Sequence, residues 1–336
     1  MSQSFPIRRV LWLCAAAGMI AVQVLAPGPR QSLFWSALFN VGHAPLYGLV
    51  ALVILRLVLW DGDRRGITRI KFYLLALVLT VVAGVLAELL QKLNHGDLEV
   101  EDVVRDAAGA AAFLLAFGAF DRRLIDRRAT ERGVIDRRLI ERRVAIARGI
   151  MLAIAASLLA VSSMPLAAIS ADLVRRDRAF PTICAFEASW ESAFVFAQKA
   201  DMQRIPPPDG WLPRPADRVA RIAFRRGAYP GLVVRKPHPN WTGFKELVFD
   251  VYSELPRPVD LVLSIHDIGH DHDYWDRFNR ELTIEPGPHR VSIPLREIQM
   301  GPRGRQLDLS RICGFVLFAN HPREPFVLYF ADFHLE

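Results

Sequence analysis

Long apolar segments constrain the fold of this chain more than any other feature of its sequence. A helix needs about 20 mostly apolar residues to cross a hydrocarbon core of roughly 30 Å, because it must satisfy its own backbone polar groups there. Five segments approach this length: Val10–Ala26, Val41–Trp60, Phe72–Leu90, Val103–Phe120 and Ile150–Ile169. The sequence therefore predicts an α-helical transmembrane bundle of about five helices.

The distribution of lysine and arginine predicts how these segments are oriented. Alternate loops carry sixteen basic residues on one side and three on the other, and ten arginines lie within residues 121–148. Basic loops are retained in the cytoplasm. We therefore expect a multi-pass protein of the bacterial inner membrane, with a cytoplasmic N-terminus and a periplasmic C-terminal domain. The same loops account for the net charge of +7, so nucleic acid is not an expected partner.

Four predicted helices occupy residues 1–120, and an Arg-rich segment follows at residues 121–148. This segment contains the pentapeptide repeat DRRLI, DRRAT, ERGVI, DRRLI, ERRVA. Five residues advance a helix by about 500°, so the repeat builds no single apolar stripe. We expect an Arg-rich cytoplasmic helical linker close to anionic headgroups, followed by a fifth transmembrane helix at residues 149–170.

The composition changes to that of an ordinary globular domain at residues 179–336. Short runs rich in β-branched and aromatic residues alternate there with Pro and Gly, which is typical of strands and turns. The runs are Glu246–Tyr252, Asp260–Ile265, Arg290–Leu295, Ile312–Phe318 and Phe326–Phe330. We expect an all-β jelly-roll sandwich. Cys184 and Cys313 lie in this domain, and the sequence leaves open whether they form a disulfide.

Polar residues inside the apolar segments are costly, so they indicate function or helix pairing. The predicted orientation places seven of them near the outer end of the bundle: Asn40, His43, Tyr47, Glu88, Gln91, Asp102 and Asp106. They come from three segments, and within each segment their spacing puts them on one helix face. We expect them to form one intramembrane polar cluster.

Residues 5–120 resemble the VanZ-like family. The motifs that carry the resemblance occur in order: Asn40, Gly42, His43, Tyr47, Glu88, Gln91, Asp102 and Gly109. Asp106 departs from the family pattern, which has Asn there, and the segment Gly96–Glu99 lacks the usual Arg. The resemblance implies a cell-envelope membrane protein whose founding relatives are associated with teicoplanin resistance.

The polar cluster admits more than one interpretation. His43, Glu88 and Asp102 are the candidate catalytic residues, because they could exchange protons with a lipid-linked or cell-wall headgroup. The same residues could instead bond one another and hold the helices together. A metal site is a third interpretation, although no compact motif such as H-E-x-x-H is present.

Residues 181–336 resemble a galactose-binding-like jelly roll of the kind found in carbohydrate-binding modules. Segments that carry the resemblance include Ala185–Glu187 as an opening strand, Tyr229–Leu232, Trp241–Tyr252, Arg277–Asn279, Pro286–Pro288 and Tyr329–Asp332. Sugars stack on aromatic rings and bond to planar polar side chains. The carbohydrate-binding candidates lie in one predicted loop: His266, Asp267, His270, His272, Tyr274, Trp275 and Arg277.

The resemblance also suggests a structural Ca²⁺ held by Glu187 and Asp332, on the first and last strands; no other cofactor is expected. No nucleophile elbow, P-loop or dinucleotide fingerprint occurs, so we favour a binding protein over an enzyme. The expected partners are the lipid bilayer and a glycan or lipid-linked sugar. The alternative function is a membrane enzyme or transporter of a lipid-linked sugar that uses the polar cluster.

Overall fold

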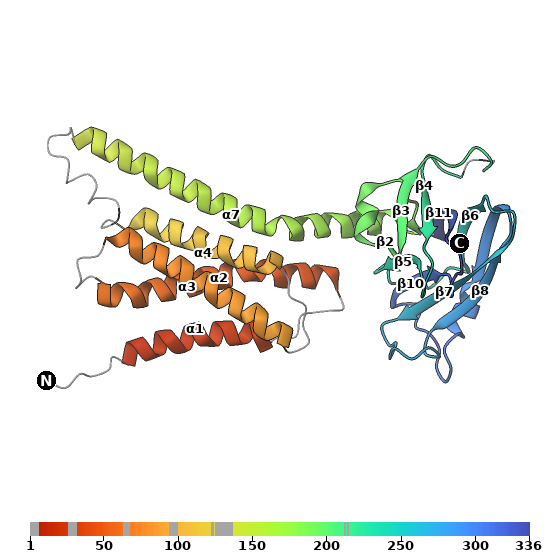
Figure 1. Ribbon diagram of the computed structural model, residues 1–336, viewed down its shortest axis with the longest axis horizontal. Helices are drawn as coiled ribbons and strands as arrows, with labels where there is room; N and C mark the ends of the chain where they lie inside the picture. Colours follow the sequence, from red (N-terminus) through yellow and green to blue (C-terminus); the bar gives the residue numbers. More distant parts are fainter. Residues whose placement is uncertain are drawn as a thin grey trace. The chain divides into compact units, whose positions relative to one another are not determined.

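The structure is a computed structural model that describes residues 7–25, 32–62, 68–93, 100–121, 124, 137–211, 213 and 215–336. The chain divides into two compact units, a helical unit of residues Met1–Ala168 and a β unit of residues Ile169–Glu336 (Figure 1).

The helical unit consists of long apolar helices. They are α1 (Ile7–Leu25), α2 (Leu33–Gly62), α3 (Arg69–Leu93), α4 (Val100–Phe120) and most of α7 (Arg137–Ala179). Among the described residues, four helices are long and apolar enough to cross a membrane: Leu33–Leu59, Arg69–Leu93, Val100–Phe120 and Glu141–Ala179. In α1, the first predicted segment, only Val10–Ala21 is apolar, which is shorter than a membrane span.

Helix α7 is continuous over 43 residues. The predicted linker at 121–148 and the predicted span at 149–170 are therefore not separate where the structure describes them. Arg, Glu, Leu and Ala are good helix formers, and no residue near position 148 stops the helix. Arg175–Arg178 belong to the last turns of the same helix. Most of the pentapeptide repeat, at residues 122–123 and 125–136, lies outside the described residues.

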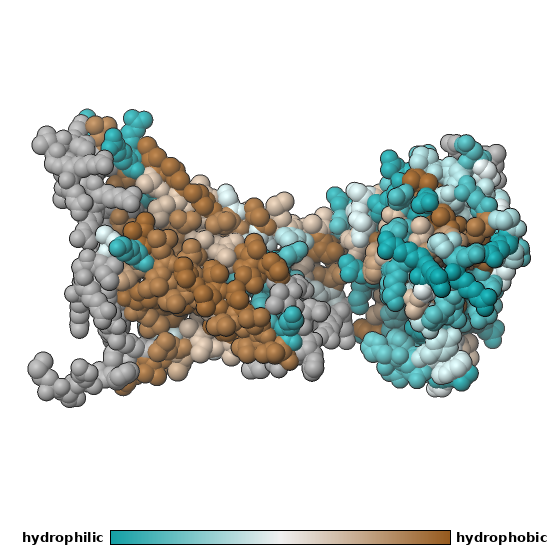
Figure 2. Space-filling model, in the orientation of Figure 1, coloured by the Kyte–Doolittle hydropathy of each residue, from teal (hydrophilic) through white to brown (hydrophobic). Residues whose placement is uncertain are grey.

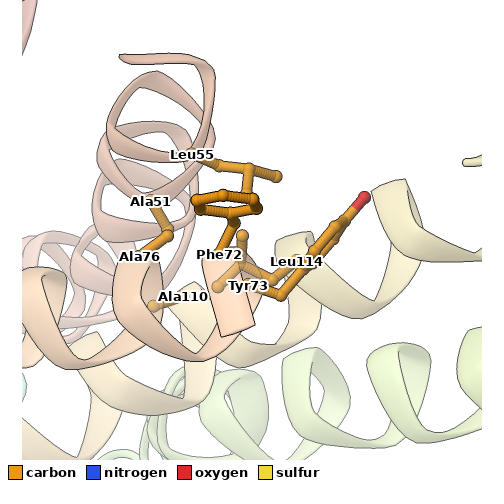
Figure 3. Packing of buried hydrophobic residues seen from close by; sticks show 7 residues of the cluster. All are labelled: Ala51, Leu55, Phe72, Tyr73, Ala76, Ala110 and Leu114. Carbon is orange, nitrogen blue, oxygen red and sulfur yellow. The ribbon is translucent and has the colours of Figure 1, made fainter. Parts of the chain in front are cut away.

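Helices α2, α3 and α4 share a core of small and large apolar side chains. Figure 3 shows this cluster, in which Phe72 and Tyr73 of α3 pack beside small residues of α2 and α4; its members are Ala51, Leu55, Phe72, Tyr73, Ala76, Ala110 and Leu114. Gly109 of α4 lies directly against the backbone of Ala44 in α2. Small residues let helix backbones approach closely, which is how helices associate where no hydrophobic effect drives them together.

The β unit is a sandwich of two antiparallel sheets. Sheet A has the order β3-β4-β11-β6-β9, with β1 paired to β11, and sheet B has the order β2-β5-β10-β7-β8. The strands of sheet A are β1 (Thr182–Cys184), β3 (Ala200–Ile205), β4 (Val219–Phe224), β6 (Glu246–Ser253), β9 (Gly287–Pro294) and β11 (Phe326–Leu335). Those of sheet B are β2 (Val195–Gln198), β5 (Gly231–Arg235), β7 (Val259–Asp267), β8 (Phe278–Ile284) and β10 (Ile312–Phe318).

The prediction of an all-β sandwich is confirmed, and the five predicted runs lie in β6, β7, β9, β10 and β11. Aromatic side chains fill the space between the sheets; the rings of Phe249 and Phe333 stack at 4.5 Å, and Trp241 is fully buried. Cys184 in β1 and Cys313 in β10 are free thiols.

The predicted opening strand at Ala185–Glu187 is wrong, because the first strand ends at Cys184. The carboxylate of Glu191, in the short 3₁₀ helix η1 (Ser189–Ala193), accepts hydrogen bonds from the N–H groups of Ala185 and Phe186 at 2.7 and 3.1 Å. It also accepts one from the N–H of Ala188 at 2.9 Å. Because these N–H groups donate to a side chain, they cannot pair with a neighbouring strand, and the chain turns after Cys184.

Candidate functional site

One row of side chains crosses the outer face of sheet B. The strand register pairs Phe196 with Val233, Val233 with Val316, Val316 with Ser264, and Ser264 with Asn279. Most of their neighbours along the strands are buried in the core, so these residues point outward, although Ser264 is only 3% exposed. We call Phe196, Val233, Val316, Ser264 and Asn279 the outer-face strip. It is apolar at Phe196, which is 38% exposed, and polar at Asn279.

Residues 268–277 form a loop at the polar end of this strip, and Arg305 ties it to β7. The guanidinium of Arg305 donates to both carboxylate oxygens of Asp267, at 2.7 and 2.9 Å. It also donates to the carboxylate of Asp276. Asp267 is only 2% exposed. One cation is therefore shared by a buried carboxylate and a second carboxylate at the base of the loop.

Further aspartates fix the backbone within the loop. The carboxylate of Asp271 accepts the N–H of Asp273 at 2.8 Å, and that of Asp273 accepts the N–H of Trp275 at 2.6 Å. Asp276 accepts the N–H of Asp271 at 2.9 Å. Aspartate side chains commonly order turns in this way. The many acids of the loop thus hold its shape.

Two aromatic side chains project from this ordered loop. Tyr274 and Trp275 are 48% and 50% exposed, and their rings meet edge to face at 4.9 Å. The guanidinium of Arg303 lies 3.3 Å from the centre of the Trp275 ring, and that of Arg277 lies 5.3 Å from the centre of the Tyr274 ring. Asn279 of the strip donates to the carbonyl of Tyr274 at 2.9 Å. Strip and loop are therefore adjacent.

Unused hydrogen-bonding capacity remains beside these rings. Among the described residues, Asn279 Oδ1 and Arg277 Nε are buried without a hydrogen-bond partner. Groups of this kind are costly to bury unless a ligand or water satisfies them. They are an acceptor and a donor that lie below the surface near Tyr274.

His266 lies on the outer face of β7, close to Gly314 of the neighbouring strand. Burial, followed by the positive charges of His270, Lys236 and Arg277, lowers the pKa of His266 to about 4. The imidazole is therefore neutral at pH 7 and can act as donor and acceptor at once.

The structure divides the predicted carbohydrate-binding residues into two groups. His266, Tyr274, Trp275 and Arg277 border the outer-face strip. Asp267 is engaged with Arg305, and His270 lies 2.9 Å from the carbonyl of Asp276, so these two belong to the framework of the loop. His272 has a positive φ of 74° in the loop. His266 and Asp267 end β7 and do not lie in the loop where we expected them.

Sequence reasoning missed Arg305, Arg303 and the strip residue Phe196, and it did not single out Asn279 within the segment Arg277–Asn279. Arg305 lies 38 residues from Asp267 along the chain, so spacing gave no signal. Alternation in β8 and β10 could have identified the outward positions, but only strand pairing shows that they form one row.

The helical unit brings a second group of predicted residues together. His43 Nδ1 lies 3.0 Å from Asp106 Oδ1, and His43 Nε2 lies 3.9 Å from Asp102 Oδ2. One donor atom each from His43, Glu88 and Asp102 lies within 4.8 Å of the others. Tyr47 is buried with its ring stacked 6.5 Å from that of His43.

Arg105 also belongs to this cluster, and no sequence motif indicated that it would. Its guanidinium donates to Asp102 Oδ1 and, at 2.8 Å, to Glu101. Asn40 and Gln91 are half-buried on α2 and α3. His43, Glu88 and Asp106 are at most 3% exposed.

The predicted calcium ligands lie in different settings. Glu187 is exposed between β1 and η1, and Asp332 in β11 pairs with His334 at 3.2 Å. Two groups of three or more potential metal ligands occur among the described residues, and neither contains Glu187 or Asp332. A Ca²⁺ ion at these residues stays a prediction.

The fold thus defines a class of protein, in which a helical unit with helices long enough to span a membrane precedes an antiparallel β-sandwich. No protein-family model matches the sequence, and no curated protein matches it.

Solved structures similar to this chain include an agarase and a carbohydrate-binding module. An exo-β-agarase is 16% identical, with a TM-score of 0.38, over 46% of this chain and 24% of its own. A family 11 carbohydrate-binding module from Clostridium thermocellum, in complex with a β-1,3-1,4-mixed-linked tetrasaccharide, is 15% identical, with a TM-score of 0.36, over 46% of this chain and 93% of its own. The match thus spans about a quarter of the agarase and most of the module.

Proposed function

We propose that the protein is an integral membrane protein of the bacterial envelope, VanZ-like in its first 120 residues, whose β-sandwich binds a cell-wall or lipid-linked glycan outside the cytoplasm. The observation that carries the proposal is the outer-face strip, which leads from apolar side chains to Asn279 beside the half-exposed rings of Tyr274 and Trp275.

A sugar ring presents apolar C–H faces and hydroxyl groups at its edge. The C–H faces suit Tyr274, Trp275 and the apolar part of the strip, while the hydroxyls suit groups that donate and accept hydrogen bonds. Arg277, Asn279 and neutral His266 supply both kinds of group. The Arg305 network orders the loop, so the rings are held in position.

Exposed apolar side chains of the helical unit support membrane insertion. Val78 and Leu86 of α3, Val104 of α4 and Val161 of α7 are each more than half exposed. Figure 2 shows such residues over much of the surface of the helical unit, whereas hydrophilic residues dominate the surface of the β unit. In water an apolar surface of this extent would be unfavourable, but in lipid it costs nothing.

Binding is tested with the full-length protein in lipid nanodiscs. Calorimetric titration with peptidoglycan fragments, a lipid-linked disaccharide and soluble β-glucans should reveal one class of glycan that binds. We expect Tyr274→Ala and Trp275→Ala each to weaken that binding about tenfold or more, since loss of one aromatic contact costs about 1.4 kcal/mol or more.

The matched control is Tyr229→Ala, because Tyr229 is also 50% exposed but packs against Phe318 and His321, away from the loop. This variant should bind as the wild type does. Absence of binding to every glycan, with binding to a periplasmic protein in its place, would mean that the sandwich is a protein-interaction module.

The VanZ-like resemblance extends the proposal to glycopeptide susceptibility. Deleting the gene should lower the minimum inhibitory concentration of teicoplanin, and complementation with the wild type should restore it. An unchanged value in the deletion strain would remove this part of the proposal and leave glycan binding intact.

The buried contact between His43 and Asp106 favours a second candidate, a membrane enzyme or transporter of a lipid-linked sugar. A histidine held by a carboxylate is suited to accept and return a proton. This candidate requires that purified protein turns over or moves a lipid-linked glycan, and that His43→Ala abolishes the activity while the protein stays folded.

A further inference from the structure

In the intramembrane polar cluster, the side chains of His43 and Asp102 are each oriented by a contact with a neighbouring residue. Asp106 Oδ1 lies 3.0 Å from His43 Nδ1 and, as a carboxylate, can only accept, so Nδ1 carries the proton. In the neutral imidazole the lone pair is then on Nε2. Arg105 in the same way binds Asp102 Oδ1, so the other oxygen of Asp102 faces His43.

The distances between the facing atoms suit a shared ion. His43 Nε2 and Asp102 Oδ2 are 3.9 Å apart, which is too long for a hydrogen bond. Two ligands bound at about 2.1 Å to one tetrahedral ion lie roughly 3.4 Å apart, about half an ångström less than this distance. A carboxylate oxygen of Glu88 completes a trio whose donor atoms lie within 4.8 Å of one another. Binding all three to one ion would require the distances between these donor atoms to shorten, by up to roughly 1.4 Å for the longest.

A second observation points to a ligand at this place. Asp106 Oδ2 is buried and has no hydrogen-bond partner among the described residues, and the Asp106 side chain is fully enclosed. This oxygen lies close to the backbone at Gly84, where a methyl group would be 2.9 Å from Asp106 Oδ2. A buried carboxylate oxygen without a donor is stabilised by a nearby cation.

We propose that His43, Glu88 and Asp102 bind a divalent transition-metal ion, with Zn²⁺ as the best match, and that Asp106 and Arg105 hold two of its ligands in place. One imidazole nitrogen and two carboxylates favour Zn²⁺ or a similar ion over Mg²⁺ and Ca²⁺, which prefer oxygen ligands alone. A histidine that ligates a metal usually donates its other N–H to a carboxylate, as His43 does to Asp106.

The β unit contains a second group of potential ligands, His270, Asp271 and Asp276, which serves as an internal control. Within the loop, Asp276 accepts from Arg305 and Asp271 accepts the N–H of Asp273. Unlike His43, Glu88 and Asp102, which are all buried, none of the three loop residues is buried, so water competes for the ligand atoms. We therefore expect no tight metal binding there.

The test uses untagged full-length protein in detergent, stripped with EDTA, loaded with Zn²⁺ and desalted before elemental analysis. We expect about one Zn²⁺ per chain in the wild type and in His270→Ala, and less than about 0.2 in His43→Ala and in the nearly isosteric Glu88→Gln. With Co²⁺ as the probe, the wild type should show visible absorption bands that both cluster variants lose.

Asp106→Asn tests the positioning role, because the amide oxygen can still accept from His43 without carrying a charge. Its Zn²⁺ dissociation constant should rise about 10- to 100-fold. Each variant is compared with the wild type by gel filtration and by its metal-free melting temperature. If His43→Ala does not fold, Glu88→Gln decides. A wild type that retains no Zn²⁺ at 100 µM, or cluster variants that retain as much as the wild type, would overturn the proposal.

Discussion

Arg305 donates paired hydrogen bonds to the buried carboxylate of Asp267, at 2.7 and 2.9 Å. This pair joins the segment after α8 (Leu295–Gln299) to the end of β7. Because the same guanidinium also holds Asp276, removing it leaves two carboxylates without their counter-charge at once.

Arg305→Ala should therefore destabilise the β unit by about 2–3 kcal/mol, toward the lower end of the cost of breaking a buried pair because Arg305 is partly exposed. The control is Arg257→Ala, since Arg257 and its partner Glu324 are both about 70% exposed and should contribute less than about 0.5 kcal/mol. Urea unfolding at pH 7, followed by tryptophan fluorescence, measures both. Equal losses in the two variants would contradict the role of Arg305.

The same network predicts acid sensitivity. Arg305 lowers the pKa of Asp276 to about 2; burial alone would raise the pKa of Asp267, but the hydrogen bonds from Arg305 and Asp308 bring it below its usual value. Both groups are more acidic folded than unfolded, so their stabilisation is full above about pH 4 and is lost as the pH falls toward 2. Unfolding free energies measured from pH 5 to pH 2 should decline more steeply in the wild type than in Arg305→Ala.

His266 should affect stability at a higher pH. Its pKa of about 4 in the folded protein lies below the value of 6.5 in the unfolded chain, so unfolding takes up a proton between these limits. Stability should fall as the pH is lowered from 6.5 to 4, and His266→Gln should flatten that part of the profile. The ring-proton resonance of His266 should titrate near pH 4; a midpoint near 6.5 would show that the ring is well solvated.

Close helix packing makes a prediction about glycine. A methyl group at Gly109 would overlap the carbonyl of Ala44, so Gly109→Ala must separate α4 from α2. We expect a loss of about 1–3 kcal/mol, seen as a lower melting temperature in detergent. Gly149→Ala is the control, because no atom lies within 4 Å of the added methyl group and alanine favours a helix. A neutral Gly109→Ala would mean that the helices are farther apart.

The predicted orientation is tested with reporters fused after Glu336. Alkaline phosphatase should be active there and green fluorescent protein dark, since the asymmetry of basic loops places the β unit outside the cytoplasm. The opposite pattern would place both candidate sites in different compartments from those we propose.

The sequence predicted the kinds of element better than their limits. Runs of β-branched and aromatic residues bounded by Pro and Gly identified β6, β7 and β10, because such residues pack well on a pleated sheet. The end of β1 depended on Glu191, whose side chain captures backbone N–H groups several residues earlier. A contact of this kind has no signature in local propensity. The continuity of α7 was missed because polar and apolar stretches were taken as separate elements.

The two candidate sites also differ in how far the sequence could predict them. His43, Asp102 and Asp106 could be grouped from the sequence, because costly polar residues on single helix faces stand out against apolar neighbours. The outer-face strip could not, since it depends on the register of five strands. Arg305 could not either, because any of the many arginines could have served the acidic loop.

The aspartate turns within residues 268–277 bear on how quickly and how selectively Tyr274 and Trp275 can engage a ligand. Little backbone freedom is left to lose on association, so a partner that matches the spacing of the two rings gains nearly the full contact free energy. A partner of another shape cannot be accommodated by remodelling the loop. Preorganisation of this kind favours selection by shape over adaptability.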